Sequence, residues 1–300
     1  ALGERDIRSG DVLGNDTIYR IYSMTKPLVS VLALKLIEEG KIRFDTPLEE
    51  IDPRFSKMRV LDHHGHVTPA SSMITIEQVL THRAGFSYDF TIGCPIAPYY
   101  REQSIMENGT RDLTDWAGVL SDIPLSYDPG TSWKYSVATD VLAHALECVT
   151  GDRIDTLLTD NIFKPLGMTD TFFSVPADKM DRFLPNHYWD RKDESLKTIG
   201  ADAGGGAMSS YTDVTLFSGG GGLVSTAHDY MRFAEMLRAQ GSFKGNQILS
   251  PKTIKFMTKD HLPKNTTVSG SGENPLSQAF RGFGFGLGFG VITDAVETQA

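Results

Sequence analysis

The hydrophobic pattern of the chain changes its period between the ends and the middle, and this change limits the fold more than any other feature. Residues 17–22 are β-branched and aromatic, which favours a short strand. Residues 282–290 alternate glycine with large apolar side chains, as a strand does when its bare face packs closely against a neighbour. Helical spacing prevails between them. We therefore expect an α+β fold with a sheet built from both ends of the chain and a largely helical insertion.

Helix signals combine apolar residues at helical spacing with start or stop residues. They predict helices that open close to Ser23 and end at Gly40, run from the capping box Thr75/Gln78 to Gly85, run from Val137 to Gly151, run from Ser225/Thr226 to Gly241, and begin at Ser250-Pro251. Ser23 and Tyr135 would thus each lie near the N-terminus of a helix.

Composition excludes several classes of protein. Of the 300 residues, 40% are hydrophobic and 22% are charged, which is ordinary for a globular chain. The longest apolar run, Pro27 to Ile37, is interrupted by Lys35 and is far shorter than the roughly 18 residues of a membrane span. A net charge of −9 without a basic stripe argues against nucleic acid as a partner. Cys94 and Cys148 are too few for a disulfide framework, although one bridge stays open.

Ser23 and Lys26 form a Ser-x-x-Lys pair at the start of a predicted helix, where residues three apart share a face. A serine hydroxyl needs an adjacent base to become a nucleophile. A lysine can supply that base only if burial or a neighbouring cation lowers its pKa. The plain alternative is an N-cap serine followed by a surface lysine, and the pair by itself does not decide between the two.

Five blocks occur together in an order and spacing that one family shares. The chain resembles the serine β-lactamase-like superfamily, in the branch that holds class C β-lactamases, family VIII carboxylesterases, D-stereospecific peptidases and some acyltransferases. The resemblance covers roughly residues 15–295 and rests on residues 21–27 (Ile-Tyr-Ser-Met-Thr-Lys-Pro), 79–86 (Val-Leu-Thr-His-Arg-Ala-Gly-Phe), 129–136 (Pro-Gly-Thr-Ser-Trp-Lys-Tyr-Ser), 162–168 (Ile-Phe-Lys-Pro-Leu-Gly-Met) and 219–226 (Gly-Gly-Gly-Gly-Leu-Val-Ser-Thr).

The resemblance implies a β-lactamase/transpeptidase-like α+β fold, with an antiparallel sheet flanked by helices and a mostly helical lobe in one catalytic unit. Residues 1–65 and 205–300 would form the sheet lobe, truncated at both ends, and residues 66–204 the helical lobe. The same resemblance implies that Ser23 is the acylated nucleophile and that Lys26 activates it. Tyr135 would shuttle protons between nucleophile, water and leaving group, whereas the plain alternative is an ordinary half-buried tyrosine.

Two departures from the family pattern sharpen the expected function. Class C β-lactamases carry an asparagine two residues after the tyrosine, but Val137 stands there and cannot contact an amide. This tilts the interpretation toward a small carboxylic ester as substrate. A Lys-Thr-Gly, His-x-Gly or Trp-x-Gly motif, which in the family gives the second oxyanion-hole N–H, is expected beyond Ala300.

We therefore predict a serine carboxylesterase that needs no cofactor and no metal, in a cytoplasmic location on the pattern of family VIII. A β-lactamase, a D-amino-acid peptidase and an acyltransferase on the same site are the alternatives, together with a catalytically silent binding or sensor protein. The sequence predicts no oligomeric state. The chain has no Gly-x-Ser-x-Gly, which disfavours an α/β-hydrolase.

Other patterns have plainer interpretations. Among the histidines, we expect His63, His64 and His66 to form a polar loop rather than a metal site, and His82 to have a structural role. We expect the glycines at 204–206 and 219–222 to form tight turns, since neither run continues into a phosphate-binding motif. Aromatic residues that could line an acyl or alcohol pocket, or simply pack, are Phe86, Tyr88, Tyr99 and Tyr100.

Overall fold

The computed structural model describes residues 3–7, 10–62, 64–106, 111–199, 211–264, 266, 268 and 280–298. Its α-helices are α1 (Thr25–Glu38), α2 (Leu48–Ile51), α3 (Ile76–Leu80), α4 (Ala97–Glu102), α5 (Leu113–Ser121), α6 (Ala138–Thr150), α7 (Ile154–Leu158), α8 (Lys164–Leu166), α9 (Ala227–Arg238) and α10 (Pro251–Met257). Short 3₁₀ segments are η1 (Tyr22–Met24), η2 (Pro53–Lys57) and η4 (Ala177–Arg182), and a π-turn, η3 (Thr159–Phe163), joins α7 to α8.

The strands are short and pair in twos within the described ranges. They are β1 (Glu4–Asp6) with β2 (Asp11–Val12), β3 (Ile18–Arg20) with β8 (Val224–Thr226), β4 (Arg59–Leu61) with β5 (Val67–Pro69), β6 (Asn186–Asp190) with β7 (Ser195–Ile199), β9 (Ser242–Phe243) with β10 (Asn246–Gln247), and β11 (Phe283–Phe285) with β12 (Gly290–Ile292).

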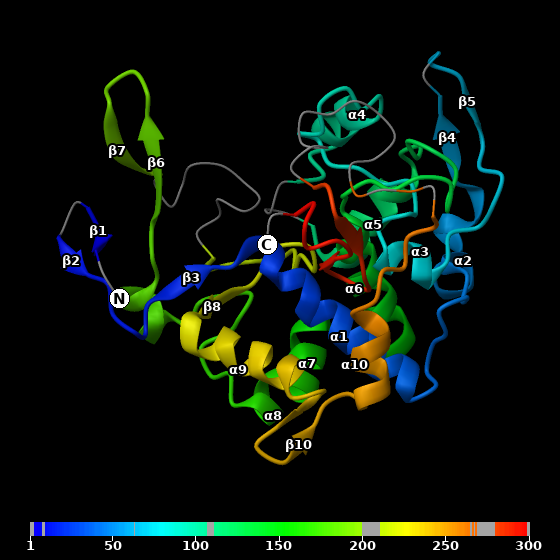
Figure 1. The fold of residues 1–300 in the computed structure, drawn as a ribbon. Helices are drawn as coiled ribbons and strands as arrows, with labels where there is room; N and C mark the ends of the chain where they lie inside the picture. Colours follow the sequence, from blue (N-terminus) through cyan, green and yellow to red (C-terminus); the bar gives the residue numbers. More distant parts are fainter. Residues whose placement is uncertain are drawn as a thin grey trace.

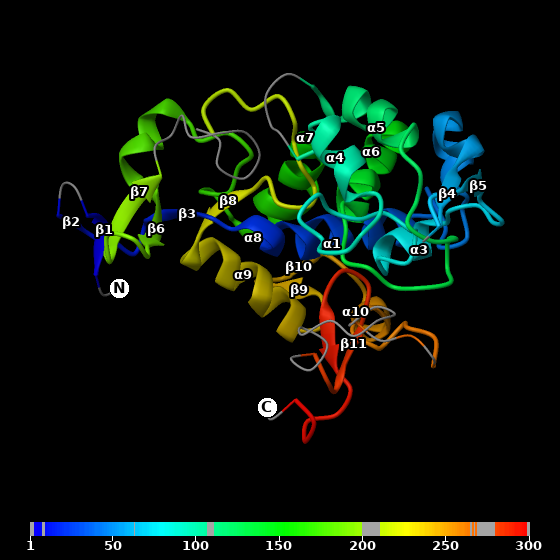
Figure 2. The same ribbon diagram turned by 90° about the horizontal axis from the view of Figure 1, so that it is seen from above.

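Helix α1 runs through the middle of the molecule (Figure 1). Helices α5, α6 and α7 lie on one side of it, and α9, α10 and β11 lie on the other (Figure 2). Its residues are apolar around most of the circumference, and Leu28, Val31 and Leu32 are fully buried, as expected for a helix covered on both sides. Because α1 is central, the side chains at its start are held by the packing of the whole core. No helix in the described part of the chain has the length and apolar character of a membrane span.

Local signals set most of the helix ends. The predicted capping box of Thr75 and Gln78 is present at the start of α3, and the side chain of Thr226 accepts a hydrogen bond at the start of α9. Gly151 ends α6 in the left-handed conformation, at φ 78°. The expected extension of α3 to Gly85 is wrong, because the chain leaves the helix after Leu80 and His82 adopts a φ of 56°.

The pairing of β3 with β8 brings the two halves of the chain together. Ile18 faces Thr226 and Arg20 faces Val224 in this antiparallel ladder. The ladder therefore joins one strand from each segment that we assign to the sheet lobe, and the division into lobes remains a proposal. The ladder positions the site because η1 and α1 follow β3 directly, and the glycine run 219–222 directly precedes β8.

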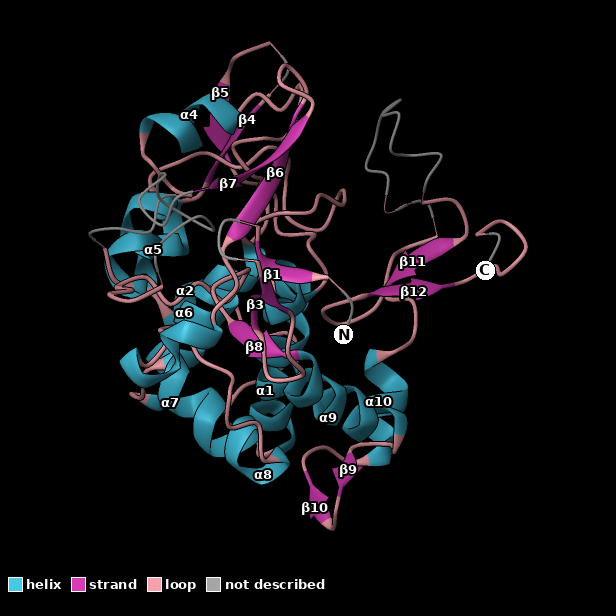
Figure 3. Ribbon diagram, turned by 90° about the vertical axis from the view of Figure 1, so that its left-hand side faces the viewer, coloured by secondary structure: helices cyan, strands magenta, loops and turns pink. Residues whose placement is uncertain are grey.

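The glycine-rich stretch near the end of the described chain is a hairpin. We expected one strand over 282–290, but β11 and β12 are antiparallel partners with Phe283 opposite Ile292. Gly288 has a φ of 102°, so the chain turns there and the expectation of a continuous strand is wrong. The close approach that the glycines indicate is present, because a Cβ on Gly288 would collide with Ser30 of α1. The hairpin stands apart from β3 and β8 (Figure 3).

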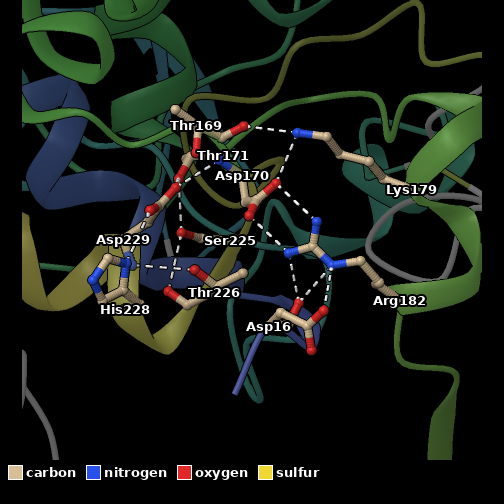
Figure 4. Close-up of polar contacts among 10 residues, drawn as sticks. All are labelled: Asp16, Thr169, Asp170, Thr171, Lys179, Arg182, Ser225, Thr226, His228 and Asp229. Atoms are coloured by element: carbon tan, nitrogen blue, oxygen red, sulfur yellow. Dashed lines mark hydrogen bonds and ion pairs between the residues drawn. The ribbon is translucent and has the colours of Figure 1, made fainter. Parts of the chain in front are cut away.

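A polar cluster fixes the start of α9 against residues 169–182 (Figure 4). The buried Asp229 carboxylate accepts hydrogen bonds from the Asp170 backbone N–H, at 2.7 Å, and from the Thr171 hydroxyl, at 3.2 Å. The Asp170 carboxylate in turn pairs with Lys179 at 2.8 Å and with Arg182 at 2.7 Å. These contacts anchor the helix that follows β8.

Candidate active site

Ser23 lies on the surface at the junction between β3 and the central helix. It belongs to η1, two residues before α1 begins at Thr25. The preceding residue, Tyr22, has a φ of 44°, in the left-handed region that side chains other than glycine rarely adopt. The Tyr22 hydroxyl accepts a hydrogen bond of 2.5 Å from the Asn186 side chain in β6. The chain therefore turns sharply just before Ser23 and leaves that side chain exposed.

Lys26 lies directly beneath Ser23 and is 2% exposed. Its Nζ atom is 3.2 Å from Ser23 Oγ and donates a hydrogen bond of 2.6 Å to the carbonyl oxygen of Gly220. The amine faces the rings of Tyr135, at 4.6 Å from the centroid, and of Tyr88, at 5.5 Å. The structure thus brings together the three residues that the sequence singled out, Ser23 and Lys26 by a hydrogen bond and Tyr135 through its ring face.

Tyr135 sits in a group of aromatic rings just before α6. The ring centroid of Tyr135 is 4.8 Å from that of His82 and 5.6 Å from that of Tyr88. His82 is fully buried, and its Nδ1 atom lies 3.2 Å from the Ser136 hydroxyl. The backbone carbonyl of His82 accepts a hydrogen bond of 3.0 Å from the N–H of Lys134. These contacts hold the segment that carries Tyr135 against the residues that follow α3.

Burial keeps two titratable neighbours of Lys26 uncharged. Burial, and then the charge of Lys26, lower the pKa of His82 well below its ordinary value. Burial, and then the charge of Asp140, raise the pKa of Tyr88 well above the ordinary value of a phenol. Both side chains are therefore neutral near pH 7, and Lys26 has no cationic histidine beside it.

Asp140 was not predicted from the sequence, although it lies close to Ser23 and Lys26. It occupies the first turn of α6 and is 5% exposed. Its carboxylate accepts hydrogen bonds from the Ser218 hydroxyl and from the Gly220 backbone N–H, the latter at 3.0 Å. The carbonyl oxygen of Gly220 accepts the hydrogen bond from Lys26. Gly220 therefore connects the buried Asp140 carboxylate to the Lys26 amine.

Comparison with known proteins places this geometry in a family. The Beta-lactamase family model matches residues 1–293. The chain belongs to the β-lactamase family. An uncharacterized protein of Mycobacterium tuberculosis is 33% identical over 303 residues, covering 99% of this chain and 72% of that protein. The esterase EstB of Burkholderia gladioli is 30% identical over 257 residues, covering 81% of this chain and 62% of that protein.

A solved structure supports the same assignment. EstCE1, described as a hydrolase with promiscuous acyltransferase activity, superposes with a TM-score of 0.81 at 25% identity, covering 99% of this chain and 75% of that chain. The predicted resemblance to the serine β-lactamase-like superfamily is confirmed, and so is the predicted α+β fold. Relatives in this superfamily include esterases and acyltransferases.

Val137 differs in this β-lactamase-family chain from the asparagine of class C enzymes, and the structure shows what the difference does. Val137 is 1% exposed and caps the start of α6. Its backbone N–H donates a hydrogen bond of 3.2 Å to the Ser87 carbonyl. The valine side chain therefore belongs to the core and offers a substrate neither a donor nor an acceptor.

The other sequence expectations meet a plain outcome in the β-lactamase-family fold. Phe86 and Tyr100 are both 1% exposed and pack in the core, so they line no open pocket. His64 and His66 lie in an exposed loop beside Asp62, while His63 and the glycines at 204–206 fall outside the described residues. Among the residues that the structure describes, no three metal-binding side chains converge. The glycines at 219–221 form turns before β8, as predicted.

Proposed function

We propose that this protein is a serine carboxylesterase that cleaves small esters through an acyl-enzyme at Ser23. The observation that carries the proposal is the exposed Ser23 hydroxyl, 3.2 Å from the amine of the buried Lys26. A buried amine beside an accessible alcohol is the arrangement that a nucleophile and its base require. Esterase names among the relatives, EstB above all, support the same class of reaction.

The reaction proceeds in two halves. Ser23 Oγ attacks the ester carbonyl carbon while its proton passes to the Lys26 amine, and the bond to the alcohol oxygen breaks as that proton reaches the leaving group. Water then attacks the acyl carbon as it gives a proton to the Lys26 amine, and the bond between Ser23 Oγ and the acyl carbon breaks as that proton returns to Ser23 Oγ and the acid leaves. The backbone N–H of Ser23 stabilises the oxyanion in both halves.

Tyr135 acts as the proton shuttle between these groups. Lys26 Nζ lies over the face of the Tyr135 ring, 4.6 Å from the ring centroid, so the tyrosine packs directly against the amine that receives the Ser23 proton. The tilted ring contact with His82, a ring that burial keeps neutral, helps to fix the orientation of the tyrosine. This role predicts that Tyr135→Phe slows both acylation and deacylation.

Release of nitrophenol from p-nitrophenyl acetate and butyrate tests the proposal. Wild-type protein is expected to turn over these esters, and Ser23→Ala is expected to lose the activity while it keeps the melting temperature, because Ser23 is exposed. Unchanged turnover in Ser23→Ala would overturn the assignment. A nitrocefin assay on the same samples tests the β-lactamase alternative, for which the buried Val137 provides no amide contact.

Acyl transfer is the second candidate, and the description of EstCE1 as a hydrolase with promiscuous acyltransferase activity favours it. An alcohol can replace water in the second half of the reaction, since both attack the same acyl-enzyme. Addition of a primary alcohol to the ester assay separates the two outcomes. A transferase gives a new ester in proportion to the alcohol, whereas a hydrolase gives only the acid.

A further inference from the structure

A buried carboxylate stands behind Lys26 and makes no direct ion pair with it. Asp140 is 5% exposed, and the described groups that donate to its carboxylate are the hydroxyl of Ser218, the N–H of Gly220 and its own backbone N–H. All of these donors are neutral. A carboxylate buried in this way costs free energy, because neutral donors replace its hydration only in part. Such a group calls for a reason beyond packing.

The link from Asp140 to Lys26 runs through one residue. Gly220 donates its N–H to the Asp140 carboxylate at 3.0 Å, and its carbonyl oxygen accepts from Lys26 Nζ at 2.6 Å. A neutral amine has two N–H bonds and one lone pair. When one N–H points at Gly220, the rotation of the amine is restricted, and the lone pair can face Ser23 Oγ at 3.2 Å.

The glycine run makes this contact possible. A Cβ on Gly220 would collide with the Asp140 carboxylate, and a Cβ on Gly219 would lie 2.6 Å from the Thr139 carbonyl oxygen. The loop therefore lies against the first turn of α6 at a distance that only glycine allows. This explains a motif that the sequence interpretation could assign only to tight turns.

We propose that Asp140 is a positioning residue for Lys26, which it orients by fixing the Gly220 carbonyl. The inference rests on the proposed function, in which Lys26 receives the proton of Ser23. Asp140 touches neither substrate nor the reacting atoms, so its effect reaches the reaction only through the loop and through its charge. Burial raises the pKa of Asp140, against the hydrogen bond from Ser218 and the charge of Lys26, so the two groups are also linked electrostatically.

The test compares Asp140→Ala, which removes the anchor, with Asp140→Asn, which keeps an oxygen acceptor but removes the charge. The readout is the rate at which a fluorophosphonate probe modifies Ser23, followed by intact mass spectrometry and normalised to folded protein. We expect Asp140→Ala to slow modification by about 100-fold, as a misplaced base does, and Asp140→Asn to restore part of the rate. The acid limb of the rate for Asp140→Asn should move to lower pH, because a negative charge near the amine is gone.

Asp229 provides the matched control. It too is a buried aspartate in the first turn of a helix, 2% exposed, and it too accepts from a hydroxyl and a backbone N–H (Figure 4). Asp229→Ala and Asp229→Asn should lower stability without changing the rate per folded molecule or its pH profile. If the Asp140 variants behave in the same way, the inference is overturned. Should Asp140→Ala not fold, Asp140→Asn against Asp229→Asn decides by the pH profile alone.

The outcome for wild type separates this inference from the proposed function. If the protein reacts with the probe at Ser23 but cleaves no ester, esterase activity fails while the Asp140 comparison proceeds on the probe rate. If wild type does not react at all, no activated Ser23 exists for Asp140 to serve, and the inference falls with the proposal.

Discussion

Two buried carboxylates have hydrogen-bond partners or lie on helix α6 one turn apart, and they differ in the charge of the groups that donate to them. Asp52 receives a guanidinium hydrogen bond of 2.6 Å from Arg54 and an imidazole contact of 2.8 Å from His144 in α6. Among the described residues, the Asp140 carboxylate, also in α6, receives a hydroxyl and backbone N–H groups, all neutral, and the charge of Lys26 acts on it without direct contact.

The electrostatic consequence has opposite signs at the two sites. Burial opposes the ionisation of Asp52, but the hydrogen bonds from Arg54 and His144 outweigh it and lower the pKa of Asp52 to about 2. Burial dominates at Asp140 and raises its pKa. Asp52 is therefore a stabilising charge, whereas Asp140 is a charge that the fold keeps at a cost. Costly charges are typical of functional sites, and this difference distinguishes the structural carboxylate from the one beside the candidate nucleophile.

The largest expected effect comes from removal of the Lys26 amine at the candidate site. Lys26→Met should lower ester turnover by about 1,000-fold or more, because Ser23 then has no base. The corresponding substitution at the other carboxylate, Arg54→Met, should leave turnover per folded molecule within about twofold of wild type. Steady-state kinetics on both variants checks this contrast. Equal losses in the two would mean that Lys26 acts on stability and not on the reaction.

Arg54→Met should in turn have the larger effect on folding. It leaves the buried Asp52 with His144 and the backbone N–H of residue 54 as partners but without its cation, and removal of one member of a buried pair is strongly destabilising. The Arg54 side chain is 38% exposed, so solvent weakens the pair and the expected loss is about 2 kcal/mol in the free energy of unfolding. Urea denaturation measures it. A loss within about 0.5 kcal/mol would show that Asp52 does not depend on the arginine.

The pH dependence of stability should differ in sign between Asp52→Asn and Asp140→Asn. The folded-state pKa of Asp52 is depressed, so its carboxylate stabilises the fold above the ordinary aspartate value, and this stability is lost as the pH falls toward about 2. The folded-state pKa of Asp140 is raised, so the wild type loses stability as the pH rises from the ordinary aspartate pKa through the raised one. Asp52→Asn should therefore be destabilised most at neutral pH, where Asp140→Asn is as stable as wild type or more so. Melting temperatures between pH 3 and pH 8 test both signs, and parallel curves for the two variants would contradict the comparison.

The smallest effect is expected from one donor to Asp140. Ser218→Ala removes the hydroxyl but keeps the Gly220 N–H, so the rate of Ser23 modification should fall by about fivefold, the equivalent of one hydrogen bond of about 1 kcal/mol. Thr171→Val makes the same change at Asp229 and should not alter the rate. If Ser218→Ala and Thr171→Val react at the same rate, the hydrogen bond from Ser218 to Asp140 does not influence the modification of Ser23.

Much of the fold could be predicted because its signals are local. The start of α1, the Thr226 cap and the Gly151 stop depend on residues within one helical turn. The pair of Ser23 and Lys26 is local as well, since residues three apart meet on one face of a helix. The prediction of a continuous strand over 282–290 was wrong because the alternation of glycine and apolar residues cannot reveal a turn at a glycine with positive φ.

The rest of the site could not be predicted because its contacts are distant in the sequence. Lys26 and Gly220 are 194 residues apart, and Asp140 and Gly220 are 80 apart. The prediction of Tyr135 depended on the resemblance to a family, because nothing in the adjacent sequence indicates that it is a base. An aspartate in the first turn of a helix usually favours the helix dipole, so Asp140 carried no signal of its own.

Identification of the acylated residue tests the central claim most directly. The protein is mixed with p-nitrophenyl butyrate, quenched with acid within the first turnovers, and analysed by intact mass and peptide mapping. The account predicts one butyryl group, carried by the peptide that contains Ser23 and absent from Ser23→Ala. Ester cleavage with no acyl group on Ser23, or with the group on another residue, would contradict it.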